Sequence, residues 1–242
     1  MSDTNKKITD YSGHENLELM AQTHKFNDWM YNETSISLKG DILEVGSGLG
    51  TFSKKIIHDF PLSHITLTDV SPNYVNELKK IFHNERISVH KLDLNSETDY
   101  NEIGYERFDS VIAINVLEHV KNDEFALQQL YKMLKKGGTL SLLVPCHKFL
   151  FNVIDESVGH FRRYTKQELT YKIKKTGFSI DKMHYFNILG MIGWYINGNL
   201  AKNPKVNPKA SIILDATVPL SKVVEKLSGK SIGLSMICHL RK

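Results

Sequence analysis

The sequence predicts an α/β fold in which a mostly parallel sheet carries helices on both faces. Three observations lead to this prediction. Short apolar runs typical of buried strands alternate with stretches of helical spacing from residue 42 to residue 186. A turn with three glycines joins the first strand to the first helix. A polar side chain stands at the end of each of the first four strands, which indicates a ligand site at the carboxyl edge of the sheet.

The glycine-rich turn follows the apolar strand of residues 42–45 and leads into a predicted helix over residues 51–59. Gly46, Gly48 and Gly50 occupy alternate positions in this turn. Because glycine lacks a Cβ, the backbone can turn sharply there and lie close against a ligand. The unpaired N–H groups at the start of the following helix would face the same ligand.

Two acidic residues narrow the class of ligand. Asp69 closes the strand of residues 64–69 and stands about 20 residues after Gly50, where a nucleotide-binding βαβ unit places a carboxylate on the ribose hydroxyls. Glu44 lies at the end of the first strand, just before the glycines. A carboxylate there is a poor neighbour for the pyrophosphate of a dinucleotide and a good neighbour for an ammonium group.

The segment Glu44-Val45-Gly46-Ser47-Gly48-Leu49-Gly50 resembles the first motif of the class I S-adenosylmethionine-dependent methyltransferases. Residues 115–120, with the sequence Asn-Val-Leu-Glu-His-Val, resemble the segment after strand four in many small-molecule methyltransferases. The resemblance covers about residues 26–242. It implies a Rossmann-like, seven-stranded sheet whose seventh strand inserts antiparallel between the fifth and sixth. It also implies S-adenosyl-L-methionine as the cofactor and S-adenosyl-L-homocysteine as its product.

The resemblance gives each polar strand end a role. Residues 46–48 would line the methionyl part of the cofactor through backbone contacts, with Glu44 near its amino end. Asp69 would accept hydrogen bonds from both ribose hydroxyls. Asp93 would accept from the adenine amino group, and Asn115 would close the site beneath the methyl-bearing end. Apolar side chains would pack on the adenine ring, so the full expected cofactor-binding set is Tyr31, Glu44, Gly46, Ser47, Gly48, Asp69, Val70, Asp93, Leu94 and Asn115.

Residues 1–37 are predicted to form an N-terminal helical cap, mostly helical from Ser12 to Ser37, in front of the methyltransferase domain of residues 38–242. Trp29 is expected to pack on the sheet edge. Two interpretations stay open for Tyr31, which either packs in the same way or covers the cofactor sulfonium with its aromatic face.

The remaining elements continue the alternation to the end of the chain. Helices are predicted over residues 51–59, 72–82, 122–134 and 165–176, and strands over residues 42–45, 64–69, 87–93, 108–115, 139–144, 177–186 and 232–242. An insertion of residues 187–231 precedes the last strand, with a linker at 201–209 and a helix pair at 211–229. Its apolar start is too short to span a membrane. It would form a wall of the acceptor pocket, a dimer contact or a membrane-surface contact.

The acceptor side is expected in the loop of residues 145–164, which follows the fifth strand. This loop ends in Gly159-His160-Phe161-Arg162-Arg163-Tyr164-Thr165, and Thr165 begins a capping box in front of the next helix. The pattern resembles a subgroup of class I methyltransferases, several of which act on natural products or peptides. The expected acceptor or lid residues are His160, Arg162, Arg163 and Tyr164, with His119 as a minority choice of catalytic base.

Each of these residues also has a plain structural interpretation. The arginines of the loop would pair with Asp155 and Glu156 in a solvated turn, and Glu118 and His119 would be satisfied within a helix-entry turn. If the loop does bind the acceptor, an arginine fork would orient a carboxylate, which needs no base. A hydroxyl or amine acceptor would instead need a base such as His160.

Composition sets the remaining expectations. The chain has 242 residues, a formal net charge of +4 and two cysteines far apart, Cys146 and Cys238. The charge is mild and spread along the chain, so no nucleic-acid partner is expected. Neither a metal site nor a disulfide framework is expected, and a cytoplasmic protein, monomeric or homodimeric, is the default. The polar first residues lack the apolar core of a signal peptide.

The sequence thus predicts an S-adenosylmethionine-dependent methyltransferase acting on a small-molecule or peptide acceptor, at oxygen first, in natural product biosynthesis. N-methylation of an amine or amino sugar is the alternative within this class. Two alternatives lie outside it. A nicotinamide-dependent oxidoreductase shares the fold, although Glu44 and the glycine spacing speak against it. A non-catalytic partner subunit would keep the cofactor residues and need no acceptor loop.

Overall fold

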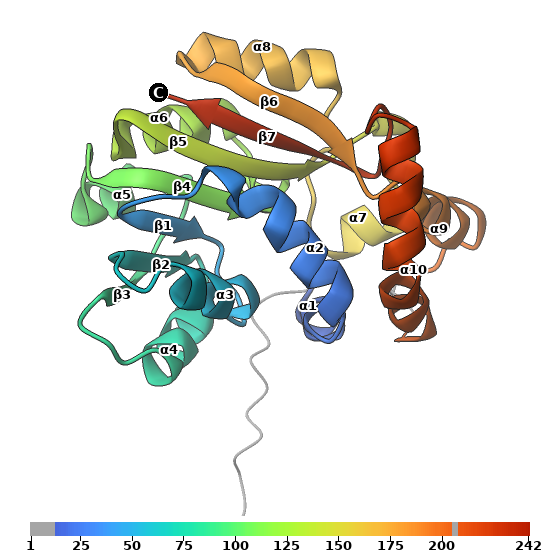
Figure 1. Ribbon diagram of the computed structural model, residues 1–242, viewed down its shortest axis with the longest axis horizontal. Coiled ribbons are helices and arrows are strands. Elements are labelled where there is room, and N and C mark those ends of the chain that lie inside the picture. The colour runs from blue at the N-terminus through green and yellow to red at the C-terminus, as the bar shows by residue number, and fades with distance from the viewer. Residues whose placement is uncertain (1–12, 205–207) are drawn as a thin grey trace, which may run out of the picture.

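The computed structural model describes residues 13–204 and 208–242, and it has one sheet with strand order β3-β2-β1-β4-β5-β7-β6 (Figure 1). The strands are β1 Ile42–Val45, β2 Ile65–Asp69, β3 Ile87–Lys91, β4 Phe108–Ile114, β5 Leu134–Pro145, β6 Ser179–Phe186 and β7 Ser235–Arg241. Strands β1 to β5 run parallel, and β7 pairs antiparallel with both β5 and β6. The predicted seven-stranded, Rossmann-like α/β fold is therefore confirmed.

Helices cover both faces of this sheet. They are α1 His14–Ala21, α2 His24–Thr34, α3 Thr51–Asp59, α4 Pro72–Ile81, α5 Glu97–Ile103, α6 Asp123–Met133, α7 Val153–Ser157, α8 Lys166–Thr176, α9 Ile188–Trp194 and α10 Pro208–Leu227. Four shorter segments are the 3₁₀ helices η1 Ser35–Ser37, η2 Leu117–His119 and η3 Lys148–Leu150 and the π-helix η4 Tyr195–Leu200. None of the helices described has the length and apolar character needed to cross a bilayer.

Successive side chains of the central strands point to opposite faces and build two cores. On one face, Leu43 and Val111 join a cluster with residues of α5, α6 and α8. On the other face, Ile42 and Ile112 pack with residues of α2, α3 and α4. Because both faces are covered, β1, β2 and β4 are apolar nearly throughout, as parallel strands require. The strand order reverses between β1 and β4, so a ligand would bind at their carboxyl ends.

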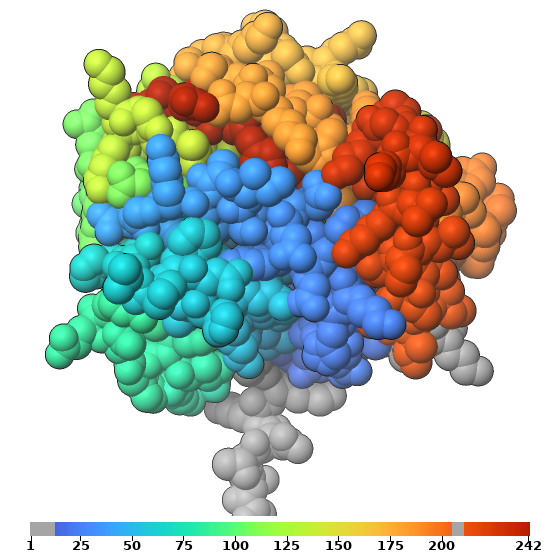
Figure 2. Space-filling model, in the orientation of Figure 1, coloured from blue at the N-terminus to red at the C-terminus, as the bar shows by residue number. Residues whose placement is uncertain are grey.

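Residues 1–12 of the predicted N-terminal cap lie outside the described residues. Residues 13–37 are mostly helical as predicted, but a break at residues 22–23 divides them into α1 and α2. The Thr23 hydroxyl donates to the Met20 carbonyl at 2.6 Å, and the Asn27 side chain donates to the same carbonyl at 2.8 Å. These bonds stabilise the end of α1 and the turn into α2. Helix α2 then lies across the sheet, in contact with β5 and β7. It adjoins α10, as the blue and red surfaces show (Figure 2). The Phe26 N–H of α2 donates to Asp215 of α10 at 2.8 Å.

Two predictions about the helices need correction. The expected helix pair at residues 211–229 is wrong, because α10 is a single helix that continues through Pro219. Val218 packs against the Phe26 and Trp29 side chains of α2, and this burial holds the helix together across the proline. Helix α5 was not predicted, because its seven residues are too few for a clear helical period.

Candidate active site

The glycine turn between β1 and α3 is shaped by left-handed backbone. Gly46 has φ +75°, and a Cβ placed on it would stand 2.5 Å from Cγ2 of Val116. Gly48 has φ +51° and lies under Leu17 of α1. The Ser47 N–H donates to the Thr68 carbonyl at 2.8 Å, which ties the turn to β2. Only glycine fits this conformation and this approach to the segment after β4.

Asp69 lies at the end of β2 and faces the glycine turn. One carboxylate oxygen accepts from the Gly48 N–H at 2.9 Å, and the other accepts from the Ser71 N–H at 2.9 Å. Burial raises the pKa of Asp69, and the backbone N–H donors oppose this shift. Each carboxylate oxygen has a second lone pair, so the position suits the two ribose hydroxyls expected from the sequence.

Glu44 lies at the end of β1 and is buried. Its carboxylate accepts hydrogen bonds from the Ser47 and Ser53 hydroxyls, which hold it beneath the turn. Burial raises the pKa of Glu44 to about 7, against the lowering effect of these two donors. A neighbouring ammonium group would favour the charged form, as expected for the amino end of the cofactor.

The other residues of the expected cofactor set differ in their surroundings. Val70 is 56% exposed, whereas Leu94 is buried in the core cluster that includes Tyr100 and Ile103 of α5. Asp93 is half-buried and accepts from the Asn95 backbone and side chain at 2.9 and 3.0 Å. Asn115 is exposed directly after β4 with φ +52°, a conformation that asparagine tolerates better than most residues.

Tyr31 of α2 packs against α3. Its buried ring packs with Ile56 of α3, and Lys55 stands 6.0 Å from the ring centroid. Burial raises the Tyr31 pKa. These neighbours favour the packing interpretation of Tyr31 over contact with the sulfonium. Trp29 packs against Phe186 with ring centroids 4.3 Å apart, which agrees with its expected packing role.

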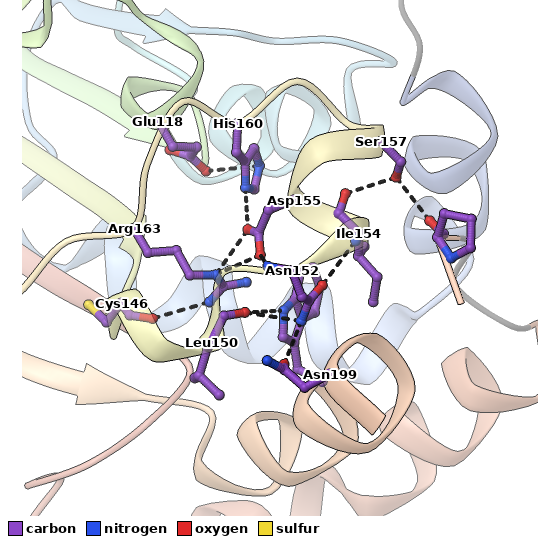
Figure 3. A network of polar contacts seen from close by, with 12 residues as sticks. Glu118, Cys146, Leu150, Asn152, Ile154, Asp155, Ser157, His160, Arg163 and Asn199 are labelled. Atoms are coloured by element: carbon purple, nitrogen blue, oxygen red, sulfur yellow. Dashed lines mark hydrogen bonds and ion pairs between the residues drawn. The ribbon is translucent and has the colours of Figure 1, made fainter. Parts of the chain in front are cut away.

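Asp155 on α7 organises the loop that was expected to bind the acceptor (Figure 3). Its fully buried carboxylate accepts from Nε of Arg163 at 2.9 Å to each oxygen, and from the Asn152 N–H at 3.1 Å. The same carboxylate lies 2.7 Å from Nδ1 of His160. Opposing its burial, these partners lower the pKa of Asp155. The Arg163 guanidinium also stacks 4.6 Å from the Trp194 ring centroid of the insertion.

Arg162 and Tyr164 have a different partner, Asp123 at the start of α6. The Tyr164 hydroxyl donates to Asp123 at 2.9 Å, and Arg162 lies 2.9 Å from the same carboxylate. Tyr164 is fully buried, whereas Arg162 is partly exposed. Thr165 caps α8 by accepting from the Glu168 N–H at 3.2 Å, which is half of the predicted capping box, whereas the Glu168 carboxylate pairs with Lys148 of η3. Arg163 and Tyr164 therefore brace the loop internally.

Glu118, His119 and His160 form a polar cluster where η2, which follows β4, meets the loop after α7. The Phe161 N–H donates to the Glu118 carbonyl at 2.8 Å, which fixes the acceptor loop over η2. The rings of His119 and His160 meet edge to face with centroids 4.6 Å apart. Burial lowers the pKa of His119 to about 4 and raises that of Glu118 to about 7. His119 is therefore neutral near pH 7.

Sequence reasoning gave Glu118 only a local structural role and treated Asp155 only as an arginine partner. Their signals were present as the adjacent Glu-His pair of residues 118–119 and the Asn-x-x-Asp spacing of residues 152–155, which forms a capping box. Only the folded loop brings the two segments together.

Two hollows elsewhere in the described chain are distinct from this region. One of about 310 Å³ lies at the amino ends of the strands and is lined by Asp41, His64 and Arg107. The other, of about 450 Å³, lies between α2 and α3 and includes Tyr31 and Asp59.

Comparison with known proteins agrees with this geometry. Residues 43–140, from β1 into β5, match a family described as a methyltransferase domain. Over 106 residues the chain is 35% identical to the highly reducing polyketide synthase verA of Penicillium polonicum, a match that covers 42% of this chain and 4% of the synthase. Over 162 residues it is 28% identical to probable polyketide synthase 10 of Dictyostelium discoideum, a match that covers 61% of this chain and 6% of the synthase. The chain thus spans only a small part of these synthases.

Among solved structures, an S-adenosylmethionine-dependent methyltransferase from Mesorhizobium loti has the same fold, with a TM-score of 0.64 at 14% identity. The alignment covers 91% of this chain and all of that one. The matched family begins at the strand that carries Glu44, and the polar strand ends surround the switch point of the shared fold. Over residues 43–140 the chain is therefore similar to a methyltransferase domain, and the whole chain shares the fold of the S-adenosylmethionine-dependent enzyme from Mesorhizobium loti.

Proposed function

We propose that this chain transfers the methyl group of S-adenosylmethionine to a small-molecule or peptide acceptor whose reacting atom loses a proton, with a hydroxyl oxygen as the first choice. The observation that supports this proposal most is the pairing of Asp155 with His160. The carboxylate lies 2.7 Å from Nδ1 of His160, and Nε2 of the same ring is directed at Glu118 (Figure 3). An imidazole oriented by a buried carboxylate is suited to handling a proton.

The arginines favour the same conclusion. An acceptor carboxylate would need a guanidinium with free N–H groups, but Arg163 is buried and committed to Asp155 and to the Cys146 carbonyl at 3.2 Å. Arg162 is bound to Asp123 and to the Lys121 carbonyl at 2.7 Å. We therefore assign Arg163 and Tyr164 to positioning the loop, and assign the acceptor to the cluster of Glu118, His119 and His160.

Methyl transfer from a sulfonium is an in-line displacement with a good leaving group. The protein needs to align the acceptor atom with the methyl carbon and sulfur, and to exclude water. The acceptor loses its proton at the Glu118–His119–His160 cluster. Its lone pair attacks the methyl carbon, and the electrons of the carbon–sulfur bond pass to sulfur to give S-adenosylhomocysteine. Asn115 and the glycine turn would hold the cofactor.

A carbon acceptor beside a carbonyl is the second candidate. The sequence relatives named above are polyketide synthases. Their growing chains contain such acidic carbons, which also need to lose a proton before they attack a methyl group. The same cluster would serve this reaction.

The test is a panel of phenolic, aliphatic hydroxyl, β-ketoacyl, carboxylate and amine acceptors incubated with ¹³C-methyl-labelled cofactor. Formation of S-adenosylhomocysteine measures turnover, and NMR of the product locates the labelled methyl group. Turnover of hydroxyl or β-ketoacyl acceptors supports the proposal. Turnover confined to carboxylates contradicts it.

A further inference from the structure

We propose that Glu118, His119 and His160 bind a divalent transition-metal ion, for which Zn²⁺ is the best match. One potential ligand atom from each residue lies within 4.8 Å of the others. Nε2 of His160 stands 3.8 Å from a Glu118 carboxylate oxygen, beyond hydrogen-bond distance. The cluster is formed by η2 and by the loop after α7, two segments about forty residues apart that the fold brings together.

The Glu118 carboxylate is the strongest sign of a missing partner. The Glu118 side chain is fully buried, and within residues 13–204 and 208–242 no other residue donates a hydrogen bond to its carboxylate oxygens, although Nε2 of His160, 3.8 Å away, is within ion-pair distance. Buried carboxylates in proteins are normally hydrogen-bonded, ion-paired or bound to a metal, because an unpaired one loses its hydration without compensation. A cation between Glu118 and the two imidazoles would supply that compensation.

Both histidines are held from behind by oxygen atoms, as metal-binding histidines usually are. Nδ1 of His160 pairs with Asp155, which leaves Nε2 directed at Glu118. The His119 ring interacts with the Gly159 carbonyl. Arg163 in turn anchors Asp155. Such outer contacts fix the orientation of each imidazole and make its other nitrogen a better ligand.

The donor set indicates which ion fits. Two imidazoles and one carboxylate form a common catalytic zinc site in which a fourth position stays open for water or substrate. Imidazole suits zinc and its neighbours, whereas magnesium prefers oxygen ligands. With bond lengths of about 2.0–2.2 Å, the ligand atoms of a tetrahedral site stand about 3.4 Å apart. The side chains would draw in by about 1 Å from their present spacing, through rotation of the two histidines.

The open position gives the ion a function, and this step rests on the function proposed above. An acceptor hydroxyl bound there would have a lowered pKa and would release its proton to water or buffer. Glu118, His119 and His160 would hold the ion, which would make the acceptor hydroxyl more acidic; the acceptor oxygen would then displace S-adenosylhomocysteine from the methyl carbon, with the electrons of the carbon–sulfur bond passing to sulfur. His160 then acts as a ligand, and the loss of the acceptor proton is driven by coordination.

The test begins with full-length protein treated with a chelator and titrated with Zn²⁺ by calorimetry. Glu118→Gln keeps the size of the side chain and removes the charge. Glu156→Gln, on the exposed side of α7, is the matched control. Titration with S-adenosylhomocysteine checks that each variant keeps its cofactor site. We expect one Zn²⁺ per wild-type chain, the same affinity in Glu156→Gln, and at least hundredfold weaker binding in Glu118→Gln. Equal Zn²⁺ affinities in wild type and Glu118→Gln, or no binding in wild type, would overturn the site.

The two proposals fail in different ways. If Zn²⁺ binding depends on Glu118 but no acceptor is turned over, the metal site is supported and the proposed function is contradicted. If a hydroxyl acceptor is turned over at the same rate with and without the chelator, the proposed function is supported and the metal site is contradicted.

Discussion

Asp155 lies 2.7 Å from Nδ1 of His160, in the interior of a loop that also contains the buried Arg163. This carboxylate both balances the arginine charge and sets the direction of the imidazole. Asp155 therefore has two proposed roles, to stabilise the loop and to orient His160. Denaturation measures the first role, and turnover measures the second.

Replacing Asp155 by alanine should destabilise the protein strongly. The change leaves the guanidinium of Arg163 buried without its carboxylate, and breaking a buried pair in this way costs about 3–5 kcal/mol. Urea denaturation of the variant measures the change in free energy of unfolding. Glu156→Ala, at the exposed neighbouring position, should change it by less than about 0.5 kcal/mol. Equal effects of the two substitutions would contradict the assignment of Asp155 as the buried hub.

Gly46→Ala should cost more stability than Gly159→Ala, although both glycines have left-handed backbone with φ +75° and +79°. An alanine at either position pays about 1–2 kcal/mol in backbone strain. Only at Gly46 does the new Cβ also meet Val116, whereas a Cβ at Gly159 meets nothing within 4 Å. Urea denaturation of both variants gives the comparison. Adding Val116→Ala to Gly46→Ala should restore part of the lost free energy of unfolding. If it restores none, the clash between residue 46 and Val116 does not cause the loss.

Asp69→Ala should weaken binding of S-adenosylhomocysteine. The variant loses the bond that holds the Gly48 N–H in place and the proposed acceptor of the two ribose hydroxyls. Hydrogen bonds to a charged group contribute about 1.5–3 kcal/mol each, so the dissociation constant should rise roughly 30-fold or more. Calorimetric titration measures it, with Asp59→Ala on α3 as a control. If Asp69→Ala binds S-adenosylhomocysteine as tightly as wild type, the proposed contact between Asp69 and the ribose is wrong.

Glu44 should make stability depend on pH in the absence of cofactor. Its folded-state pKa is raised to about 7 from an ordinary value of 4.5, because the side chain is buried. The proton is bound more tightly in the folded protein, so this contribution to stability is fully present below pH 4.5. It is lost as pH rises through 7, by roughly 3 kcal/mol in all.

Glu44→Gln removes this titration and keeps an acceptor for Ser47 and Ser53. Relative to wild type, the free energy of unfolding of the variant should therefore rise between pH 5 and pH 8. Urea denaturation at the two pH values tests this, with Glu102→Gln on the exposed side of α5 as the control. Parallel behaviour of wild type and Glu44→Gln would show that Glu44 does not titrate in this range.

The features that sequence reasoning predicted well are those with local causes. Apolar runs mark β1 and β4 because both sheet faces are covered, the glycines mark a turn that needs left-handed backbone, and Thr165 caps α8 within a single turn. The acceptor loop was harder to predict because its contacts join distant segments. Nothing near Asp155 in the sequence indicates that it selects His160 and Arg163 as buried partners. The burial of Glu118 likewise depends on the later loop that covers it.

Tyr31 illustrates a second limit. Its position on a cap helix was predictable, but the helix face that meets α3 depends on how α2 crosses the sheet. That crossing is set by α10, about 180 residues later, through Asp215 and Val218.

The most direct test of the account compares wild type with His160→Ala on two related acceptors at one pH. One is a hydroxyl compound that has to lose a proton, and the other is a carboxylate that is already ionised. We predict that turnover of the hydroxyl compound falls about 10²- to 10⁴-fold in the variant while its affinity for S-adenosylhomocysteine is kept. Equal turnover of the hydroxyl compound by both proteins would contradict the assignment of acceptor chemistry to His160 and its cluster.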